Sequence, residues 1–325
     1  MAQLKTTFAG LALENPIIIS SSGLTNSAEK IKKLEEAGAG AVVLKSVFEE
    51  QISMQAGSMQ GYGSLEADDY LGAYVRSHAL NEHINLIEET KKICHIPVIA
   101  SINCYSDSEW VDFATMMEKA GADALEINIL SLQTDKDYTP GSFEQRHIDI
   151  LCHIKKVVKI PVIMKLGSNL TNPVALINQL YANGAAAVVL FNRFYQTDIN
   201  IDTMAFTSAN VMSTPNELPD RLRWTAIASA AVPRLDYAVS GGVHCGKGVI
   251  KSILAGAAAV EVCSVIYQYG AKEIENMKKE LSEWMDEKGY ESLSQFKGKM
   301  NAESAGEINP FERTQFMRYY SNREE

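Results

Sequence analysis

The segment Ala37-Gly38-Ala39-Gly40-Ala41-Val42-Val43-Leu44 indicates the architecture of this 325-residue chain, because similar segments begin at Ala120, Asn183 and Ala255. In each copy a helical pattern precedes the glycine, and an aliphatic run follows the small residues. Glycine readily adopts the left-handed conformation with which many helices end. Each copy therefore predicts the end of a helix that packs closely on the strand after it.

Further apolar runs complete a set of eight strands. The word Ile-Pro-Val-Ile occurs at 96–99 and again at 160–163, where proline can end a helix and begin a strand. The predicted strands begin near Ile17, Ala41, Val98, Ala124, Val162, Ala187, Tyr237 and Ala259. Helical patterns cover residues 27–37, 107–120, 143–158, 173–183, 246–255 and 270–288.

This alternation of strands and helices predicts a parallel sheet in an α/β protein. Eight such units predict a (β/α)8 TIM barrel. An open doubly wound sheet is the alternative, but no GxGxxG follows a predicted strand. We expect a single domain over 1–325, with insertions at 49–81 and 194–220 after the second and sixth strands. A C-terminal helical extension ends in an aromatic-containing tail, 301–325, which we expect to pack on the barrel or on a second subunit.

Composition narrows the function classes. The formal net charge of -10 argues against a nucleic-acid partner, because phosphate-binding surfaces usually carry a basic excess. The 5 cysteines form no CxxC pair, so they predict reduced thiols in the cytoplasm rather than a zinc ribbon or an iron–sulfur cluster. No HExxH motif is present, and we expect no metal site. The apolar runs are far shorter than the roughly 20 residues that span a bilayer, so we expect no membrane association.

The polar residues that end the strands are the candidate site, because function in such barrels lies at the C-terminal ends of the strands. Lys45 and Lys165 are predicted to be buried there, where an ammonium must face a counter-charge or a ligand. For Lys165 a structural ion pair with Glu126 is the alternative. The run Ser240-Gly241-Gly242, one strand before Ser264, indicates a phosphorylated cofactor, although a Gly-Gly pair by itself is often only a tight turn.

Taken together, these segments resemble the dihydroorotate dehydrogenase superfamily of FMN-binding barrels over roughly residues 4–298. The resemblance is carried by Thr6–Gly10 with Glu14-Asn15-Pro16, Ser21-Ser22-Gly23, Leu44-Lys45-Ser46, Glu126-Ile127-Asn128, Lys165, Asn192, Ser240-Gly241-Gly242-Val243, Cys263-Ser264 and Gly289–Gly298. Cys263 stands where the family usually has glycine.

The resemblance implies an FMN-dependent enzyme that oxidises dihydroorotate to orotate in pyrimidine biosynthesis by hydride transfer to FMN. It also implies the soluble class of the family, a homodimer, and a soluble electron acceptor or a partner flavoprotein. The implied FMN-binding residues are Ser21, Ser22, Gly23, Lys45, Ser46, Asn128, Lys165, Gly241, Gly242, Cys263 and Ser264. The implied residues for a small carboxylate substrate are Lys45, Asn128, Asn192 and Arg193. Ser131 and Lys45 would be catalytic, Ser131 as the base, and Lys165 would stabilise the anion of reduced FMN.

Three segments depart from the family pattern. The substrate loop, Asn-Ser-Met-Gly-Leu-Pro-Asn in the family, has no counterpart in the corresponding region, which reads Arg-Ser-His-Ala-Leu-Asn at 76–81. The catalytic segment, Asn-x-Ser-Cys-Pro-Asn or Asn-x-Ser-Ser-Pro-Asn in the family, reads Asn-Ile-Leu-Ser-Leu-Gln at 128–133, so Ser131 is either the base or an ordinary loop serine. Arg193 replaces an expected serine or threonine and either clamps a carboxylate or pairs with a surface acid. These departures leave open an FMN oxidoreductase that acts on another small unsaturated or cyclic acid, or a barrel that binds FMN without turnover.

Overall fold

The computed structural model describes residues 2–48, 65–104, 110–305 and 311–312, with only the helical backbone described for 65–77. Eight parallel strands form a barrel, in the order β4-β3-β13-β12-β9-β8-β7-β6, and pairing of β4 with β6 closes it. They are β3 (Ile17–Ile19), β4 (Ala41–Val43), β6 (Val98–Asn103), β7 (Ala124–Asn128), β8 (Val162–Gly167), β9 (Ala187–Asn192), β12 (Asp236–Ser240) and β13 (Ala259–Val262). The predicted TIM barrel and its eight strands are confirmed.

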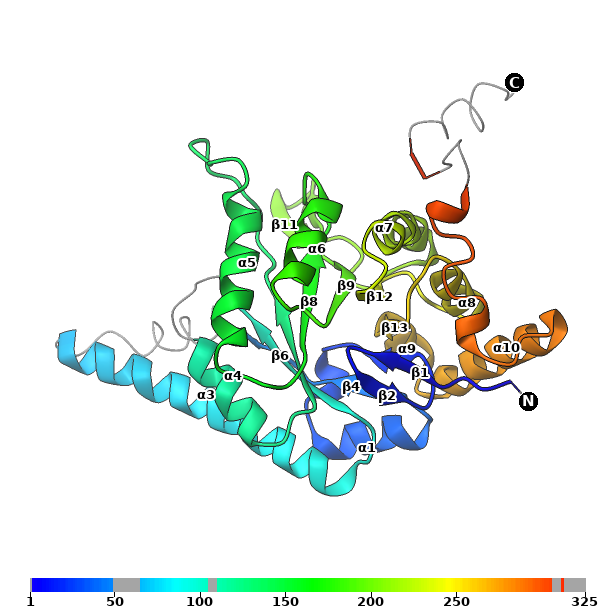
Figure 1. The fold of residues 1–325 in the computed structure, drawn as a ribbon. Coiled ribbons are helices and arrows are strands. Elements are labelled where there is room, and N and C mark those ends of the chain that lie inside the picture. Colours follow the sequence, from blue (N-terminus) through cyan, green and yellow to red (C-terminus); the bar gives the residue numbers. More distant parts are fainter. Residues whose placement is uncertain (1, 49–64, 105–109, 306–310, 313–325) are drawn as a thin grey trace.

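Helices surround the strands (Figure 1). They are α1 (Ala28–Glu36), α3 (Leu65–Ile93), α4 (Trp110–Lys119), α5 (Ser142–Lys155), α6 (Pro173–Ala182), α7 (Leu218–Ala231), α8 (Gly246–Leu254), α9 (Ser264–Tyr269) and α10 (Lys272–Lys288). The six predicted helices are confirmed within a few residues. The described part of the 49–81 insertion, from residue 65 onward, belongs to α3.

Local sequence explains where the helices end and the strands begin. The glycines of the four repeated words have φ between 90° and 115°, as expected for left-handed helix ends. The backbone at the start of each Ile-Pro-Val-Ile segment is held by a glutamate near the end of a helix, Glu35 in α1 and Glu118 in α4. Glu35 Oε1 accepts hydrogen bonds from the backbone N–H groups of His95 and Ile96, and Glu118 Oε1 accepts those of residues 159 and 160.

The interior of the barrel changes from apolar to polar along the strands. The hairpin of β1 (Thr6–Phe8) and β2 (Leu11–Leu13) covers the N-terminal end, where the Ala9 N–H donates to Asp236. Phe8 and Leu13 of this hairpin pack with Ile18, Ala41, Val43, Ile99, Ala124, Ile163, Ala187, Val189, Ala238, Ala258 and Ala259. Because side chains alternate along a strand, the next inward residues form a polar layer of Ser20, Ser101, Glu126, Lys165 and Glu261. This layer is the floor of the C-terminal mouth.

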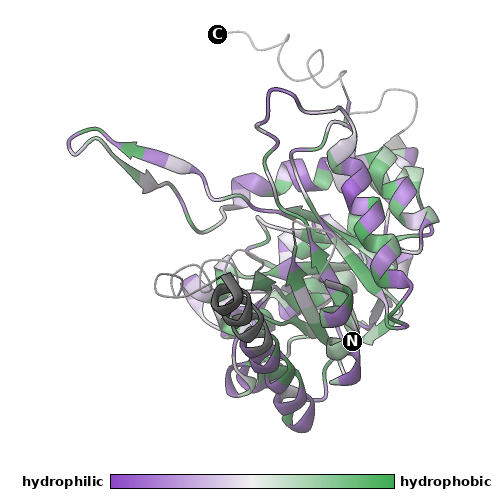
Figure 2. Cartoon of the chain, turned by 90° about the vertical axis from the view of Figure 1, so that its left-hand side faces the viewer, coloured by the Kyte–Doolittle hydropathy of each residue, from purple (hydrophilic) through white to green (hydrophobic). Residues whose placement is uncertain are grey.

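Two segments extend beyond the barrel. The 194–220 insertion contains the hairpin β10 (Thr197–Asn200) and β11 (Ala205–Ser208), which projects from the body of the molecule (Figure 2). Residues 301–305 of the predicted tail lie near α7, because the Ala302 N–H donates to the Ala226 carbonyl. Most of the tail, including Phe316, Tyr319 and Tyr320, lies outside the described residues. Within the described ranges, no helix is both long and apolar enough to cross a membrane.

Candidate active site

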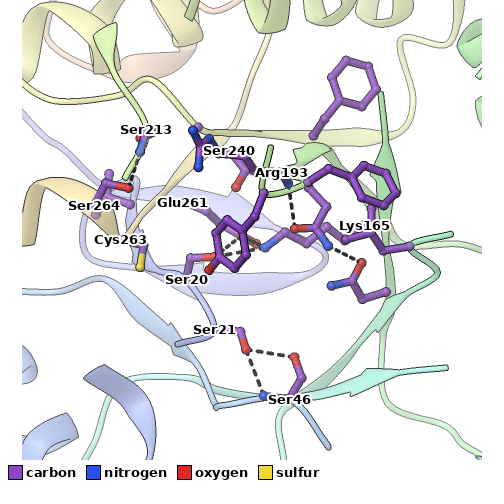
Figure 3. Close-up of a pocket in the computed structure, with 18 of the residues that line it drawn as sticks. Ser20, Ser21, Ser46, Lys165, Arg193, Ser213, Ser240, Glu261, Cys263 and Ser264 are labelled. Carbon is purple, nitrogen blue, oxygen red and sulfur yellow. Dashed lines mark hydrogen bonds and ion pairs between the residues drawn. The ribbon is translucent and has the colours of Figure 1, made fainter. Parts of the chain in front are cut away.

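A cavity of about 390 Å³ opens at the C-terminal mouth of the barrel (Figure 3). Its size is typical of pockets that bind small molecules. Ten of the predicted site residues line it, namely Ser21, Ser46, Asn128, Lys165, Asn192, Arg193, Gly241, Gly242, Cys263 and Ser264. The barrel thus brings together residues from seven strand ends that are far apart in sequence.

A buried ion pair forms the floor of this cavity. Lys165 Nζ lies 2.6 Å from Glu261 Oε2 and 3.5 Å from Glu126 Oε1. It also donates a hydrogen bond to Ser20 Oγ at 3.0 Å, and Ser20 Oγ in turn donates to Glu261 Oε2 at 2.9 Å. The predicted partner Glu126 lies 3.5 Å from Lys165 Nζ, but the closer partner is Glu261. The sequence carried a signal for it, since a charged residue interrupts the apolar run 259–262 just as Glu126 interrupts 124–127.

The two carboxyl groups differ in charge. Burial raises the pKa of Glu126 well above its usual range, and the negative charge of Glu261 raises it further. Burial also opposes ionisation of Glu261, but the Lys165 ammonium and the hydrogen bonds to the carboxylate hold its pKa below the usual range. Burial would lower the pKa of Lys165, but the charges of Glu126 and Glu261 hold it above its usual value. The cluster therefore favours an ammonium on Lys165, a carboxylate on Glu261 and the neutral form of the Glu126 carboxyl group.

A chain of serine hydroxyls runs from the mouth into the barrel. Ser21 Oγ accepts a hydrogen bond from the Ser46 N–H at 2.9 Å and lies 2.9 Å from Ser46 Oγ. Ser46 Oγ lies 2.8 Å from Ser101 Oγ. Ser101 stands beside Glu126 in the register of neighbouring strands. These contacts fix the hydroxyl of Ser46 at the edge of the cavity.

The Gly-Gly turn after β12 is built so that only glycine fits. Gly241 and Gly242 have φ of 92° and 81°, and a Cβ on Gly242 would collide with the backbone of Leu218. Among the described residues no acceptor faces the backbone N–H groups of Gly241 and Gly242. Successive N–H groups in such a turn form a concave anion-binding site. The turn therefore fits a phosphate group.

A loop of the 194–220 insertion lies against this turn. The Ser213 N–H donates to Ser264 Oγ at 2.9 Å, and Ser213 Oγ lies 3.0 Å from His244 Nε2. Sequence reasoning missed Ser213, and no sequence signal marks it, because it reaches the cavity only through the fold of the insertion. Four aromatic lining residues were missed as well: Phe194 and Tyr195 belong to the same insertion, whereas Phe48 and Phe191 lie at or near the ends of strands.

Asn192 and Arg193 follow β9 and point to different partners. Asn192 Nδ2 donates to Asn128 Oδ1 at 2.7 Å, so two predicted substrate ligands meet at the mouth. Arg193 Nε donates to the Glu217 carboxylate at 3.0 Å. Its two terminal nitrogens donate to the carbonyls of Asn210 and Val211 at 2.7 and 2.6 Å. Of the two roles that the sequence left open, the structure shows the pairing with an acid.

Four predicted residues do not line the cavity. Ser22 Oγ accepts from the Leu24 N–H and caps the short helix η1 (Gly23–Thr25), which includes Gly23. Ser131 is partly exposed, and its hydroxyl contacts the Leu132 carbonyl and the Gln133 amide, neither of which is a base. Lys45 is exposed, so its predicted burial is wrong. The strand β4 ends at Val43, and Leu44 rather than its neighbour turns into the core.

The described part of the chain contains neither a candidate metal-ligand cluster nor a disulfide bond. No group of three or more histidine, cysteine, aspartate or glutamate side chains there could hold a metal ion. All five cysteines are free. The cavity therefore offers hydrogen-bond donors, one buried ion pair and an anion-binding turn.

Known proteins resemble this chain over nearly its whole length. A family model described as dihydroorotate dehydrogenase matches residues 3–285. The catalytic subunit of dihydroorotate dehydrogenase B (NAD(+)) from Thermoplasma volcanium is 30% identical over 308 residues, which cover 92% of this chain and 98% of that protein. Its counterpart from Thermoplasma acidophilum is 27% identical, with 92% and 99% covered. The NAD-dependent dihydropyrimidine dehydrogenase subunit PreA from Escherichia coli is 24% identical, with 92% and 77% covered.

Proposed function

The chain belongs to the dihydroorotate dehydrogenase family, and on this premise we propose that it oxidises dihydroorotate to orotate in pyrimidine biosynthesis, with FMN as its cofactor. Membership makes the chain an oxidoreductase that acts on CH–CH donors. One observation carries the finer proposal. A single cavity joins an anion-binding turn, Gly241-Gly242, to a floor that holds Lys165.

The residues of the cavity fit FMN. The backbone N–H groups of Gly241 and Gly242 would hold the phosphate of FMN, together with Ser264, which lines the same cavity. The cavity continues from this turn to Lys165 and Ser46, which would face the flavin ring. When bound, FMN would supply the acceptor for a hydride. The protein would supply binding, orientation and charge around it.

The paired amides of Asn128 and Asn192 would hydrogen-bond the polar groups of the pyrimidine ring. Lys45, exposed beside Ser46, would supply the cation for the substrate carboxylate. Arg193 was the other predicted carboxylate ligand, but its nitrogens already donate to Glu217 and to two carbonyls. We therefore assign Arg193 to holding the 194–220 insertion at the mouth.

Ser131 is proposed as the base that takes a proton from the substrate. A Ser131→Ala variant should still bind FMN, with an unchanged flavin spectrum, but should lose reduction of the flavin by substrate. Rapid anaerobic mixing measures this rate directly. An unchanged rate would show that Ser131 is an ordinary loop serine.

A second substrate class is a dihydropyrimidine without a carboxylate. The engagement of Arg193 with Glu217 favours it, because this removes one of the two cations predicted to bind a carboxylate. The similarity to a dihydropyrimidine dehydrogenase subunit points the same way. The further alternatives are an FMN oxidoreductase that acts on another small unsaturated or cyclic acid, and a barrel that binds FMN without turnover.

The deciding experiment is the anaerobic visible spectrum of the purified protein with dihydroorotate and, separately, with dihydrouracil. Bleaching of a flavin spectrum by dihydroorotate supports the proposal. Bleaching by dihydrouracil alone assigns the second substrate class. A flavin that neither compound reduces rejects both substrates, and a protein that binds no flavin rejects the cofactor.

We also propose a homodimer in the cytoplasm that passes its electrons to a soluble acceptor or a partner flavoprotein. The relatives are named as catalytic subunits, and the free thiols suit a reducing compartment. The β10–β11 hairpin supports a subunit contact, because its large apolar side chains are between 61% and 89% exposed: Ile199, Ile201, Met204 and Phe206. Light scattering of a Met204→Ser/Phe206→Ser variant should show a monomer where the parent is a dimer. Equal masses would reject this contact.

A further inference from the structure

The cation at the floor of the cavity is almost fully neutralised within the protein. Lys165 is 4% exposed, and its nearest charged atom is Glu261 Oε2 at 2.6 Å. Both residues line the cavity (Figure 3). A ligand in the cavity therefore meets an ion pair at the floor rather than an isolated ammonium. Glu261 was not among the site residues predicted from the sequence.

Geometry shows which of the two glutamates carries the negative charge. Glu261 accepts hydrogen bonds from Lys165 and from Ser20, both through Oε2. In the described structure, neither oxygen of Glu126 accepts a hydrogen bond, its nearest approach to Lys165 is 3.5 Å, and it can hydrogen-bond to the Glu261 carboxylate only as the neutral acid. A buried charge requires a close partner and hydrogen bonds, whereas a neutral carboxyl group tolerates their absence far better. The charge therefore resides on Glu261, in agreement with the opposite pKa shifts of the two groups.

We propose that Glu261 is a positioning residue that lowers the reduction potential of the bound flavin by neutralising Lys165. The proposal rests on the FMN site proposed above. Reduction by a hydride delivers two electrons and one proton, and so leaves one additional negative charge on the flavin. An ammonium beside the ring stabilises this charge and raises the potential, and a carboxylate 2.6 Å from the ammonium offsets that stabilisation. The lower potential makes the reduced flavin a stronger donor to its acceptor.

Glu261→Gln in the FMN-loaded protein tests this, because glutamine keeps the shape and hydrogen bonding of the side chain but removes its charge. Glu126→Gln is the matched control, because it makes the same substitution at the other glutamate near Lys165, on the adjacent strand β7. We measure the two-electron potential by equilibration with a dye, and the Kd of sulfite, an anion whose addition to oxidised flavin also leaves negative charge on the ring. Neither readout requires the physiological substrate.

Glu261→Gln should shift the equilibrium toward the reduced flavin by about tenfold, which raises the two-electron reduction potential by about 30 mV. The Kd of sulfite should fall by a similar factor. Glu126→Gln should change neither. An unchanged potential in Glu261→Gln, or equal shifts in both variants, would overturn the proposal. If Glu261→Gln does not fold, the double variant Lys165→Gln/Glu261→Gln replaces it. This variant removes both charges, so its potential should lie near that of the parent. A changed potential in that double variant contradicts the proposal.

The two proposals fail in different ways. A parent protein that binds no FMN overturns the proposed cofactor and this inference together. A parent that binds FMN and is reduced by dihydroorotate, but whose potential does not respond to Glu261→Gln, overturns only the role of Glu261.

Discussion

Replacement of Lys165 by methionine should be among the most destabilising single changes in the barrel. Methionine fills a similar volume, but it leaves the Glu261 carboxylate buried without its cation. Removing one partner of a buried ion pair typically costs about 3–5 kcal/mol of unfolding free energy, whereas an exposed pair contributes about 0–1 kcal/mol. Lys165 and Glu261 have side chains only 5% and 1% exposed and lie 2.6 Å apart, so the larger range applies.

The assay is urea unfolding of flavin-free protein, so that a difference in flavin affinity does not enter. Lys45→Met is the matched control, because the same substitution is made at an exposed strand-end lysine. It should change the unfolding free energy by no more than about 0.5 kcal/mol. The contrast between the two variants isolates the effect of burial and pairing.

A second substitution tests the cause. Adding Glu261→Gln to Lys165→Met removes the unpaired carboxylate, and neutral replacement of both partners of a buried pair is often nearly without cost. The double variant should therefore regain most of the lost stability. A Lys165→Met variant within about 1 kcal/mol of the parent, or a double variant less stable than the single one, would show that the buried pair does not act in this way.

Two further predictions follow from the same region. Because burial and the charge of Glu261 raise the folded-state pKa of Glu126 above its unfolded value, the parent should lose stability as the pH rises above that value, by up to about 1.4 kcal/mol per pH unit. Glu126→Gln should remove this slope in urea midpoints measured at increasing pH above the ordinary glutamate pKa, and parallel curves for parent and variant would contradict it. Gly242→Ala should weaken FMN binding in fluorescence titrations by displacing the phosphate turn, because its Cβ would strike the Leu218 backbone. Gly248→Ala, where a Cβ meets only ordinary contacts in α8, should bind FMN like the parent.

The elements that the sequence predicted correctly are those whose signals are local. The glycine that ends each repeated word and the aliphatic run after it lie within one short segment, so the helix ends and strand starts could be placed without tertiary information. The alternation of eight strands with helices then favoured a closed barrel over an open sheet. The β10–β11 hairpin carries no such signal, because its side chains face solvent on both sides and follow no buried alternation.

The candidate site was predicted in part because barrels of this type place function at their strand ends. Lys165 and Asn128 lie on strands that continue to the mouth, and both line the cavity as expected. Lys45 was misplaced because sequence alone does not show that β4 ends at Val43, after which the alternation of inward and outward side chains is lost. Arg193 could be recognised as a cation but not assigned a partner, since Glu217 comes from the far end of an insertion.

The class of fold, the family and ten of the residues that line the cavity could be read from the sequence, because these depend on local patterns and on motifs. The pairing of the buried charges, in contrast, depends on contacts between strands that are far apart in the sequence. Lys165 on β8 and Glu261 on β13 are 96 residues apart and lie on strands separated in the sheet by β9 and β12. Closure of the barrel directs both side chains inward at the same level. Because the site is buried there, the glutamate closer to Lys165 is the one that carries the charge.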